Sequence, residues 1–239
     1  MSDILKNRTS MIREMNKISY LQPDEQGEYI KKLEQSGVLG RYPMVGIDEW
    51  LAVNVDSPID ETLRVARDMG KAKYIESKPI SEDDKKLIVQ FLMSIKDNDK
   101  AMGFGQNQCY YNAQMTLLQA YPLLQGDPWL RRLKYCEGYV EIPNSLYPFS
   151  HAWCLFDSYL IDPTLLHPSL SDGNRKPDLS DRIFGEIPTG WKYFGISFNA
   201  SAVYKMVKKN NYGYAPFLDH SRSNFSMLDA LIHLDNVSN

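Results

Sequence analysis

The stretch that decides the fold runs from Gln106 to Thr164. Its informative parts are Gln106-Asn-Gln-Cys-Tyr-Tyr-Asn-Ala113, Glu137-Gly-Tyr-Val140, His151-Ala-Trp153 and Ile161-Asp-Pro-Thr164. A cysteine, a histidine and an aspartate follow one another along this stretch. Each has a local context that suits, in turn, a nucleophile, a general base and an acid that orients the base. Cys109, His151 and Asp162 are therefore the candidate catalytic residues.

The sequence around Cys109 predicts a helix that begins at the cysteine. Ala113, Leu117 and Ala120 recur at helical spacing, and Asn107 or Gln108 stands where an N-cap belongs. In the first turn of a helix, free N–H groups and the positive end of the dipole stabilise a thiolate. The alternative is a buried structural cysteine, and position alone does not decide between the two.

The segment between the histidine and the aspartate predicts two short strands joined by a two-residue turn at 157–158. This register places Trp153 opposite Asp162 and His151 opposite Thr164. Cross-strand partners share a face, as do residues two apart, so His151 and Asp162 are diagonal neighbours roughly 7–8 Å apart at the backbone. A carboxylate there fixes the imidazole tautomer and stabilises the imidazolium that forms when the histidine takes the thiol proton.

Together these motifs resemble the transglutaminase-like branch of the papain-like cysteine enzymes. The resemblance covers about Gly103 to Thr164, about a quarter of the chain. It implies that Cys109 is the nucleophile, His151 the general base and Asp162 the orienting carboxylate. It also implies an α+β fold with a papain-like (transglutaminase-like) core, in which the cysteine-bearing helix packs on an antiparallel sheet.

The group that stabilises the oxyanion is marked less clearly. The papain pattern has a glutamine six residues before the cysteine, but that position is Gly103 here. We expect the backbone N–H of Cys109 to be one donor and Gln106 to supply a side chain, with Trp153 as a further candidate for oxyanion or substrate contact. Glu137 is a charge that could fall near the site, either against a substrate cation or as a structural hydrogen-bonding group, and the structural role is favoured.

The composition predicts a soluble globular protein. Hydrophobic residues make up 43% and aromatic residues 12% of the chain, which is ample for a packed core. A net charge of -3 and a pI near 5.8 give no drive toward nucleic acid or acidic membranes. Three cysteines without a CxxC pair argue against a disulfide framework. The N-terminus lacks a signal-peptide core and no apolar run is long enough to span a bilayer, so a cytoplasmic location is expected.

The pattern along the chain predicts two regions, a mainly helical part over 1–98 and the catalytic core over 99–239. In the first region we expect helices at 2–18, 24–36, 58–70 and 81–95, and a strand around 50–55. After the cysteine helix we expect strands at 133–142, 182–187 and 191–198, and helices at 199–209 and 223–234. Residues 169–180 are expected to form a loop that covers the site.

These features favour a cysteine-dependent acyl-transfer enzyme that acts on amide bonds through a Cys109 thioester. Water as acceptor makes it a peptidase, amidase or deamidase, and an amine makes it a transglutaminase. The expected substrate is a protein or peptide, and no cofactor or metal is expected, because a zinc site from the cysteines and His151 lacks paired ligand spacing. His167 is a rival base, but its proline-flanked loop offers no orienting acid.

The alternative is a catalytically silent protein-binding module that reuses the same fold. The N-terminal amphipathic helices either cover the core or bind a partner protein.

Overall fold

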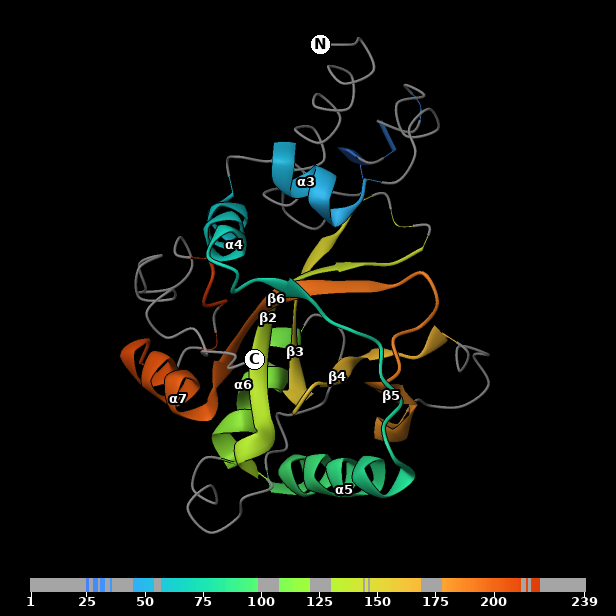
Figure 1. Ribbon diagram of the computed structural model, residues 1–239, viewed down its shortest axis with the longest axis vertical. Helices are drawn as coiled ribbons and strands as arrows, with labels where there is room; N and C mark the ends of the chain where they lie inside the picture. Colours follow the sequence, from blue (N-terminus) through green and yellow to red (C-terminus); the bar gives the residue numbers. More distant parts are fainter. Residues whose placement is uncertain are drawn as a thin grey trace.

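The computed structural model describes residues 45–53, 57–98, 108–120, 130–143, 145, 147–168, 178–211, 214 and 216–219, together with positions 25, 28, 29, 31, 32 and 35. This part of the chain combines a six-stranded sheet with helices on its faces and ends (Figure 1). The α+β class predicted from the sequence is confirmed.

The sheet is antiparallel at every junction between neighbouring strands. Its strands are β1 Lys73–Tyr74, β2 Leu133–Glu141, β3 Phe149–Phe156, β4 Tyr159–Leu166, β5 Arg182–Gly185 and β6 Lys192–Asn199. They lie in the order β1-β6-β2-β3-β4-β5. The three consecutive strands β2, β3 and β4 form the middle of the sheet as a meander. The strands expected at 133–142, 182–187 and 191–198 are therefore confirmed to within about two residues at their ends.

The cysteine-bearing helix α6, Cys109–Ala120, packs against β2, β3 and β4. Ala113, Leu117 and Ala120 are completely buried, as their helical spacing predicts. Along β2 the side chains alternate between two hydrophobic clusters, with Tyr135 and Tyr139 in the cluster that contains α6 and Cys136 and Val140 in the other. In Figure 1 the segment that follows β1 runs across the front of the sheet, and α6 lies behind it. The central strands are thus buried on both faces.

Three further helices follow the sequence prediction. They are α4 Pro58–Asp68, α5 Glu82–Asn98 and α7 Ala200–Lys209. Side chains cap the starts of α5 and α7. Ser81 Oγ accepts a hydrogen bond from the Asp84 N–H at 3.1 Å, and Asn199 Oδ1 accepts one from the Ala202 N–H at 2.9 Å.

The strand expected around 50–55 is wrong, because residues Ile47–Val53 form helix α3. Ile47, Trp50 and Leu51 are all buried, and their spacing of three and four places them on one face of a helix. Trp50 Nε1 also donates to Asp60 Oδ1 at 3.2 Å, which fastens α3 to α4. Helical spacing of the apolar residues therefore outweighs the strand preference of the tryptophan and valines.

Some expectations concern residues that the structure does not describe. The helices predicted at 2–18 and 223–234 lie outside the described residues, and so does most of the predicted covering loop at 169–180. The described positions within 24–36 are helical. Strand β1 comes from the region predicted to be mainly helical, so residues on both sides of position 98 contribute to one sheet. In the described ranges, no helix is both long and apolar enough to cross a membrane.

Candidate active site

The β3–β4 hairpin has the register that a two-residue turn requires. Its ladder pairs Phe156 with Tyr159, Leu155 with Leu160 and Cys154 with Ile161. Asp157 adopts φ 53 in the turn, where short polar residues tolerate the left-handed region. The side chain of Asp157 also accepts a 2.8 Å hydrogen bond from Arg132 Nε. The register inferred from the sequence is confirmed over these three pairs.

The regular ladder ends at Cys154–Ile161, so the predicted pairs Trp153–Asp162 and His151–Thr164 lie beyond it. Pro163 has no N–H to donate. In addition, Asp162 Oδ1 accepts the backbone N–H groups of Thr164 at 2.9 Å and Leu165 at 3.0 Å, which curls the strand around its own side chain. The pairing of β4 with β5 is irregular over the same residues. Strand β4 therefore separates from β3 at Asp162, the residue whose carboxylate contacts His151.

The imidazole and the carboxylate meet as the sequence predicts. His151 Nε2 lies 2.7 Å from Asp162 Oδ2, and both side chains are almost completely buried. A fourth donor, the hydroxyl of Tyr193 on β6, also reaches Asp162 Oδ2 at 2.9 Å. Each oxygen of Asp162 thus accepts two hydrogen bonds. Burial alone would raise the pKa of Asp162, but the neighbouring His151 and the backbone N–H groups of Leu165 and Thr164 hold it below its usual value.

Cys109 is the other group that acts on the imidazole. It lies close enough to His151 for its side chain to raise the pKa of that ring. Since Nε2 faces Asp162, Nδ1 is the ring nitrogen left for the sulfur. Burial lowers the pKa of His151, but the Asp162 carboxylate and Cys109 outweigh it and raise the pKa to about 10. At neutral pH the ring therefore carries a proton and is a cation beside Cys109.

The three cysteines differ in their access to solvent. None of them is in a disulfide; Cys109 is partly exposed, whereas Cys136 and Cys154 are buried. Burial also raises the pKa of Cys154, because the charged form would lose its hydration. The sequence did not decide between a reactive and a structural Cys109, and the structure gives it both an imidazole partner and a route to solvent.

We expect Cys109 to be alkylated much faster than Cys136 and Cys154 when the native protein receives a short pulse of iodoacetamide near pH 7. The difference should exceed about tenfold, because only Cys109 combines exposure with a cationic neighbour. Peptide mapping by mass spectrometry measures the three rates, and the urea-unfolded chain serves as the control in which the three should converge. Slower labelling of Cys109 than of either buried thiol in the native protein would contradict the assigned geometry.

Three aromatic side chains pack around the imidazole of His151. The Trp153 ring stacks on His151 at a centroid distance of 6.2 Å and an interplanar angle of 18°, and Phe149 and Tyr193 border the same ring. A Cβ at Gly195 would lie 2.7 Å from Trp153 Cη2, so glycine is needed there for the indole to fit over β6. Packing of this kind limits rotation of the histidine.

Trp153 itself has a different position from the one expected. It is 0% exposed, so a substrate cannot touch it, and its contact with His151 is one of support. Its indole Nε1 has no hydrogen-bond partner among the described residues. Gln106, the other candidate for the oxyanion, lies outside the described residues.

Glu137 is a structural residue, as favoured from the sequence. It is 1% exposed, and its carboxylate accepts the backbone N–H groups of Phe217 at 2.6 Å and Leu218 at 2.9 Å, as well as the hydroxyl of Tyr135. Burial raises the pKa of Glu137 to about 7 against the opposing effect of these hydrogen bonds. This carboxylate therefore fastens a C-terminal segment to the sheet and does not face a substrate.

Two contributors to the site escaped the sequence reasoning. Tyr193 reaches Asp162 from a strand that is distant in the sequence, and no local spacing marks it. Asn112, three residues after Cys109, donates from Nδ2 to Thr164 Oγ1 at 3.2 Å and so ties the first turn of α6 to the end of β4. Its position one helical turn from the cysteine was a signal that could have been used.

His167, the rival base, follows β4, and its backbone N–H donates to the Asp181 carbonyl oxygen at 2.8 Å.

The raised pKa of His151 predicts how stability depends on pH. The stabilisation that this histidine contributes is complete below its unfolded pKa of about 6.5 and is lost as the pH rises through about 10. The pKa of Asp162 is lowered in the folded protein. The stabilisation that this carboxylate contributes is therefore lost as the pH falls below its unfolded pKa of about 3.9. We therefore expect the difference in melting temperature between the wild type and His151→Gln to be largest near pH 5–6.5.

That difference should narrow steadily toward pH 10. Calorimetric melting at several pH values measures it, and His167→Gln is the matched control, with the same substitution at a histidine outside the triad. A His151→Gln difference that stays constant from pH 6 to pH 10, or that widens, would mean that the imidazole is not held as a cation.

Among the described residues, no group of three or more histidine, cysteine, aspartate or glutamate side chains is placed to hold a metal ion. Comparison of the chain with protein-family models, with curated proteins and with solved structures found no match. The arrangement of the Cys109, His151 and Asp162 side chains is therefore the main indication of function.

Proposed function

We propose that this chain is a cysteine-dependent acyl-transfer enzyme that acts on amide bonds of a protein or peptide. The observation that carries the proposal is the position of His151, which is hydrogen-bonded to Asp162 and whose pKa is raised further by the nearby Cys109, a partly exposed residue at the start of a helix. A nucleophile, a base and an orienting acid in contact are the signature of activated nucleophilic catalysis. Structural histidines do not need this pair of partners.

The chemistry follows from the pair of charges. The Cys109 thiolate attacks the amide carbonyl carbon, a C–S bond forms, and the carbonyl π electrons move to the oxygen. The tetrahedral species collapses, the C–N bond breaks, and the leaving amine takes the proton from His151. This leaves a Cys109 thioester. Water or an acceptor amine then gives its proton to His151 and attacks the thioester, which releases the thiolate.

The buried carboxylate supports each of these steps without exchanging protons itself. Asp162 accepts four hydrogen bonds, so it stays ionised and keeps the Nε2 proton of His151 in place. This leaves Nδ1 as the atom that gives and takes the proton at the sulfur. The backbone N–H of Cys109, at the start of α6, is our candidate for stabilising the oxyanion.

The papain-like, transglutaminase-like character of the core is part of the same proposal. It is supported by a cysteine-bearing helix that packs on an antiparallel sheet, with the histidine and the aspartate on two adjacent strands of that sheet. The order of the three residues along the chain agrees with the resemblance described above.

A survey of a whole proteome tests the proposed function. A cell extract is incubated with the wild type or with Cys109→Ala, and mass spectrometry then searches for new peptide termini, for deamidated glutamine or asparagine, and for amine crosslinks. We expect one of these three classes of change with the wild type only, and the class identifies hydrolysis or transfer. Identical spectra for the two proteins would favour the silent binding module over the enzyme.

A further inference from the structure

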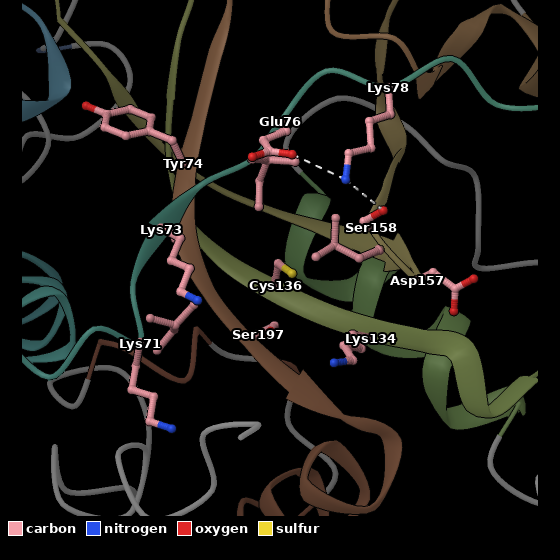
Figure 2. A pocket seen from close by; sticks show the side chains of 14 residues that line it. Lys71, Lys73, Tyr74, Glu76, Lys78, Lys134, Cys136, Asp157, Ser158 and Ser197 are labelled. Carbon is pink, nitrogen blue, oxygen red and sulfur yellow. Dashed lines mark hydrogen bonds and ion pairs between the residues drawn. The ribbon is translucent and has the colours of Figure 1, made fainter. Parts of the chain in front are cut away.

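The three triad residues lie on different elements, so their geometry depends on how α6 is fixed to the sheet. A cavity of about 270 Å³ lies between the segment 71–78 and strands β2, β3 and β6 (Figure 2). Cys136 and Leu155 on its floor belong to the hydrophobic cluster on the face away from α6. The cavity is lined by none of the described residues of α6 or β4. The contacts that locate Cys109 therefore lie on the face that α6 covers.

A side chain in the first turn of α6 reaches the strand that carries the acid. Asn112 lies three residues after Cys109, so the two side chains are neighbours on the helix surface. Asn112 Nδ2 donates to Thr164 Oγ1 at 3.2 Å, and both of these residues are almost completely buried. The backbone of Asn112 stays in the helix, where its N–H donates to the Gln108 carbonyl oxygen at 2.8 Å. The amide side chain is thus a polar contact between α6 and β4.

Thr164 is itself fixed to the orienting carboxylate. Its N–H donates to Asp162 Oδ1 at 2.9 Å, and its carbonyl oxygen accepts from Arg182 Nη1 on β5. The hydroxyl of Thr164 is therefore held two residues from the acid, while Asn112 is three residues from the nucleophile. The nucleophile and the acid are consequently connected by two routes, one through the imidazole and one through the Asn112–Thr164 contact.

The other half of the Asn112 amide lacks a partner. Among the described residues, no group donates to Asn112 Oδ1, although this atom is buried. A buried amide oxygen without a donor lowers stability, because it has lost its hydration and gained no hydrogen bond. Leucine has nearly the same shape, brings no polar atom and has a higher helix propensity. Asparagine is thus an unfavourable residue here if packing is its only role.

Apolar packing defines the position of α6 less sharply than a hydrogen bond does. Ala113 and Leu117 are buried where α6 packs on the sheet, but apolar contacts have no preferred direction. A hydrogen bond restricts both distance and angle. A displacement of about 1 Å in a catalytic group can lower the rate about 10²-fold. The contact between Asn112 and Thr164 therefore supplies a constraint that packing alone does not.

We propose that Asn112 is a positioning residue of this site, which acts through Thr164 to hold the Cys109 thiol at the imidazole that Asp162 orients. Asn112 is 0% exposed, so it does not touch a substrate itself. The inference rests on the proposed acyl-transfer function and adds to it a polar contact that is retained for geometry although it does not favour stability. Removal of the contact should therefore impair the reaction without destabilising the fold.

The double variant Asn112→Leu/Thr164→Val tests this proposal. It removes both polar partners and keeps their shapes, a change that is nearly neutral or stabilising for a buried hydrogen bond. We expect a melting temperature no lower than that of the wild type, and acetylation of Cys109 by p-nitrophenyl acetate that is about 10- to 100-fold slower. Peptide mapping by mass spectrometry measures the acetylation rate, and calorimetry measures the melting temperature of the same preparation.

Two further variants separate positioning from a general disturbance of α6. Gln114→Leu also exchanges a fully buried amide on α6 for leucine, but this amide donates to the Tyr135 hydroxyl at 3.0 Å on β2, a strand without a triad residue. Its acetylation rate should stay close to that of the wild type. Thr164→Ser keeps the acceptor hydroxyl and should recover most of the rate that Thr164→Val loses.

Alkylation by iodoacetamide separates this inference from the proposed function, because it needs the reactive thiol but no acyl transfer. We expect Cys109 to be alkylated more slowly in the double variant than in the wild type. Unchanged acetylation and alkylation in the double variant would overturn the positioning role alone. So would equal rates for Thr164→Ser and Thr164→Val, or a loss in Gln114→Leu as large as in the double variant. A wild-type Cys109 that is neither acetylated nor alkylated faster than Cys136 would overturn the proposed function and this inference with it.

Discussion

Replacement of Cys109 by serine is expected to lower turnover on an amide substrate by about 10⁴-fold or more. Losses of this size are seen when one catalytic residue is removed from a hydrolase with a catalytic triad. The serine hydroxyl is nearly isosteric with the thiol, so the first turn of α6 and its contact with Thr164 through Asn112 should persist. What is lost is ionisation, because a hydroxyl beside His151 does not form the stable anion that a thiol does.

The matched control is Cys136→Ser, which makes the same exchange at a buried cysteine outside the site. It should retain turnover close to that of the wild type. Turnover of Cys109→Ser within about tenfold of the wild type, measured on protein with an unchanged melting temperature, would exclude Cys109 as the nucleophile. Kinetics and melting on the same preparation separate a chemical effect from a loss of fold.

Replacement of Asp162 by asparagine is expected to reduce turnover by about 10²- to 10³-fold. Two backbone N–H groups face Oδ1, so the amide oxygen should stay there and the amide nitrogen should take the place of Oδ2. That nitrogen is a donor, and His151 Nε2 must then accept from it. The ring proton moves to Nδ1, beside the sulfur, which is the wrong tautomer for a base.

The loss should be smaller than the roughly 10⁴-fold reported for the same change in serine-protease triads, since a thiol at a helix start depends less on its base. Asp60→Asn is the matched control. Asp60 is also fully buried, and its carboxylate accepts from Trp50 Nε1, so the same exchange is made at a buried aspartate outside the triad. An Asp162→Asn protein that melts like the wild type and turns over undiminished would remove Asp162 from the mechanism, whereas one that does not fold would make the carboxylate structural.

The local part of the site could be predicted from the sequence. The helix at Cys109 has a clear apolar stripe, and the turn at Asp157-Ser158 leaves one register that places His151 and Asp162 on the same face. Both depend on residues close together in the chain. The structure confirms the helix start, three pairs of the hairpin and the 2.7 Å contact between the imidazole and the carboxylate.

The parts that escaped prediction depend on distant contacts. Tyr193 bonds to Asp162 only because β6 crosses to the far side of β2, and no local pattern specifies that crossing. Strand β1 is two residues long and exists because it pairs with β6. Helix α3 was predicted to be a strand because a short apolar segment with tryptophan and valine is compatible with a helix or a strand. Only knowledge of which residues are buried distinguishes the two.

The position of Trp153 illustrates a different limit. The His-Ala-Trp motif places the indole two residues from the base, which on a strand means the same face. Whether that face is open to a substrate depends on what covers it. Here Tyr193 and Gly195 of β6 close over the ring, so the residue supports the histidine from inside the protein.

The most direct test of the central claim is to trap the acyl-enzyme. The protein is incubated briefly with p-nitrophenyl acetate at neutral pH, quenched in acid and mapped by mass spectrometry, before and after treatment with neutral hydroxylamine, which cleaves thioesters. We expect an acetyl group on Cys109 that hydroxylamine removes, that is absent in Cys109→Ser and that forms much more slowly in His151→Gln. Acetylation spread over lysines with none on Cys109, or equal acetylation of Cys109 in His151→Gln, would contradict a nucleophile activated by this histidine.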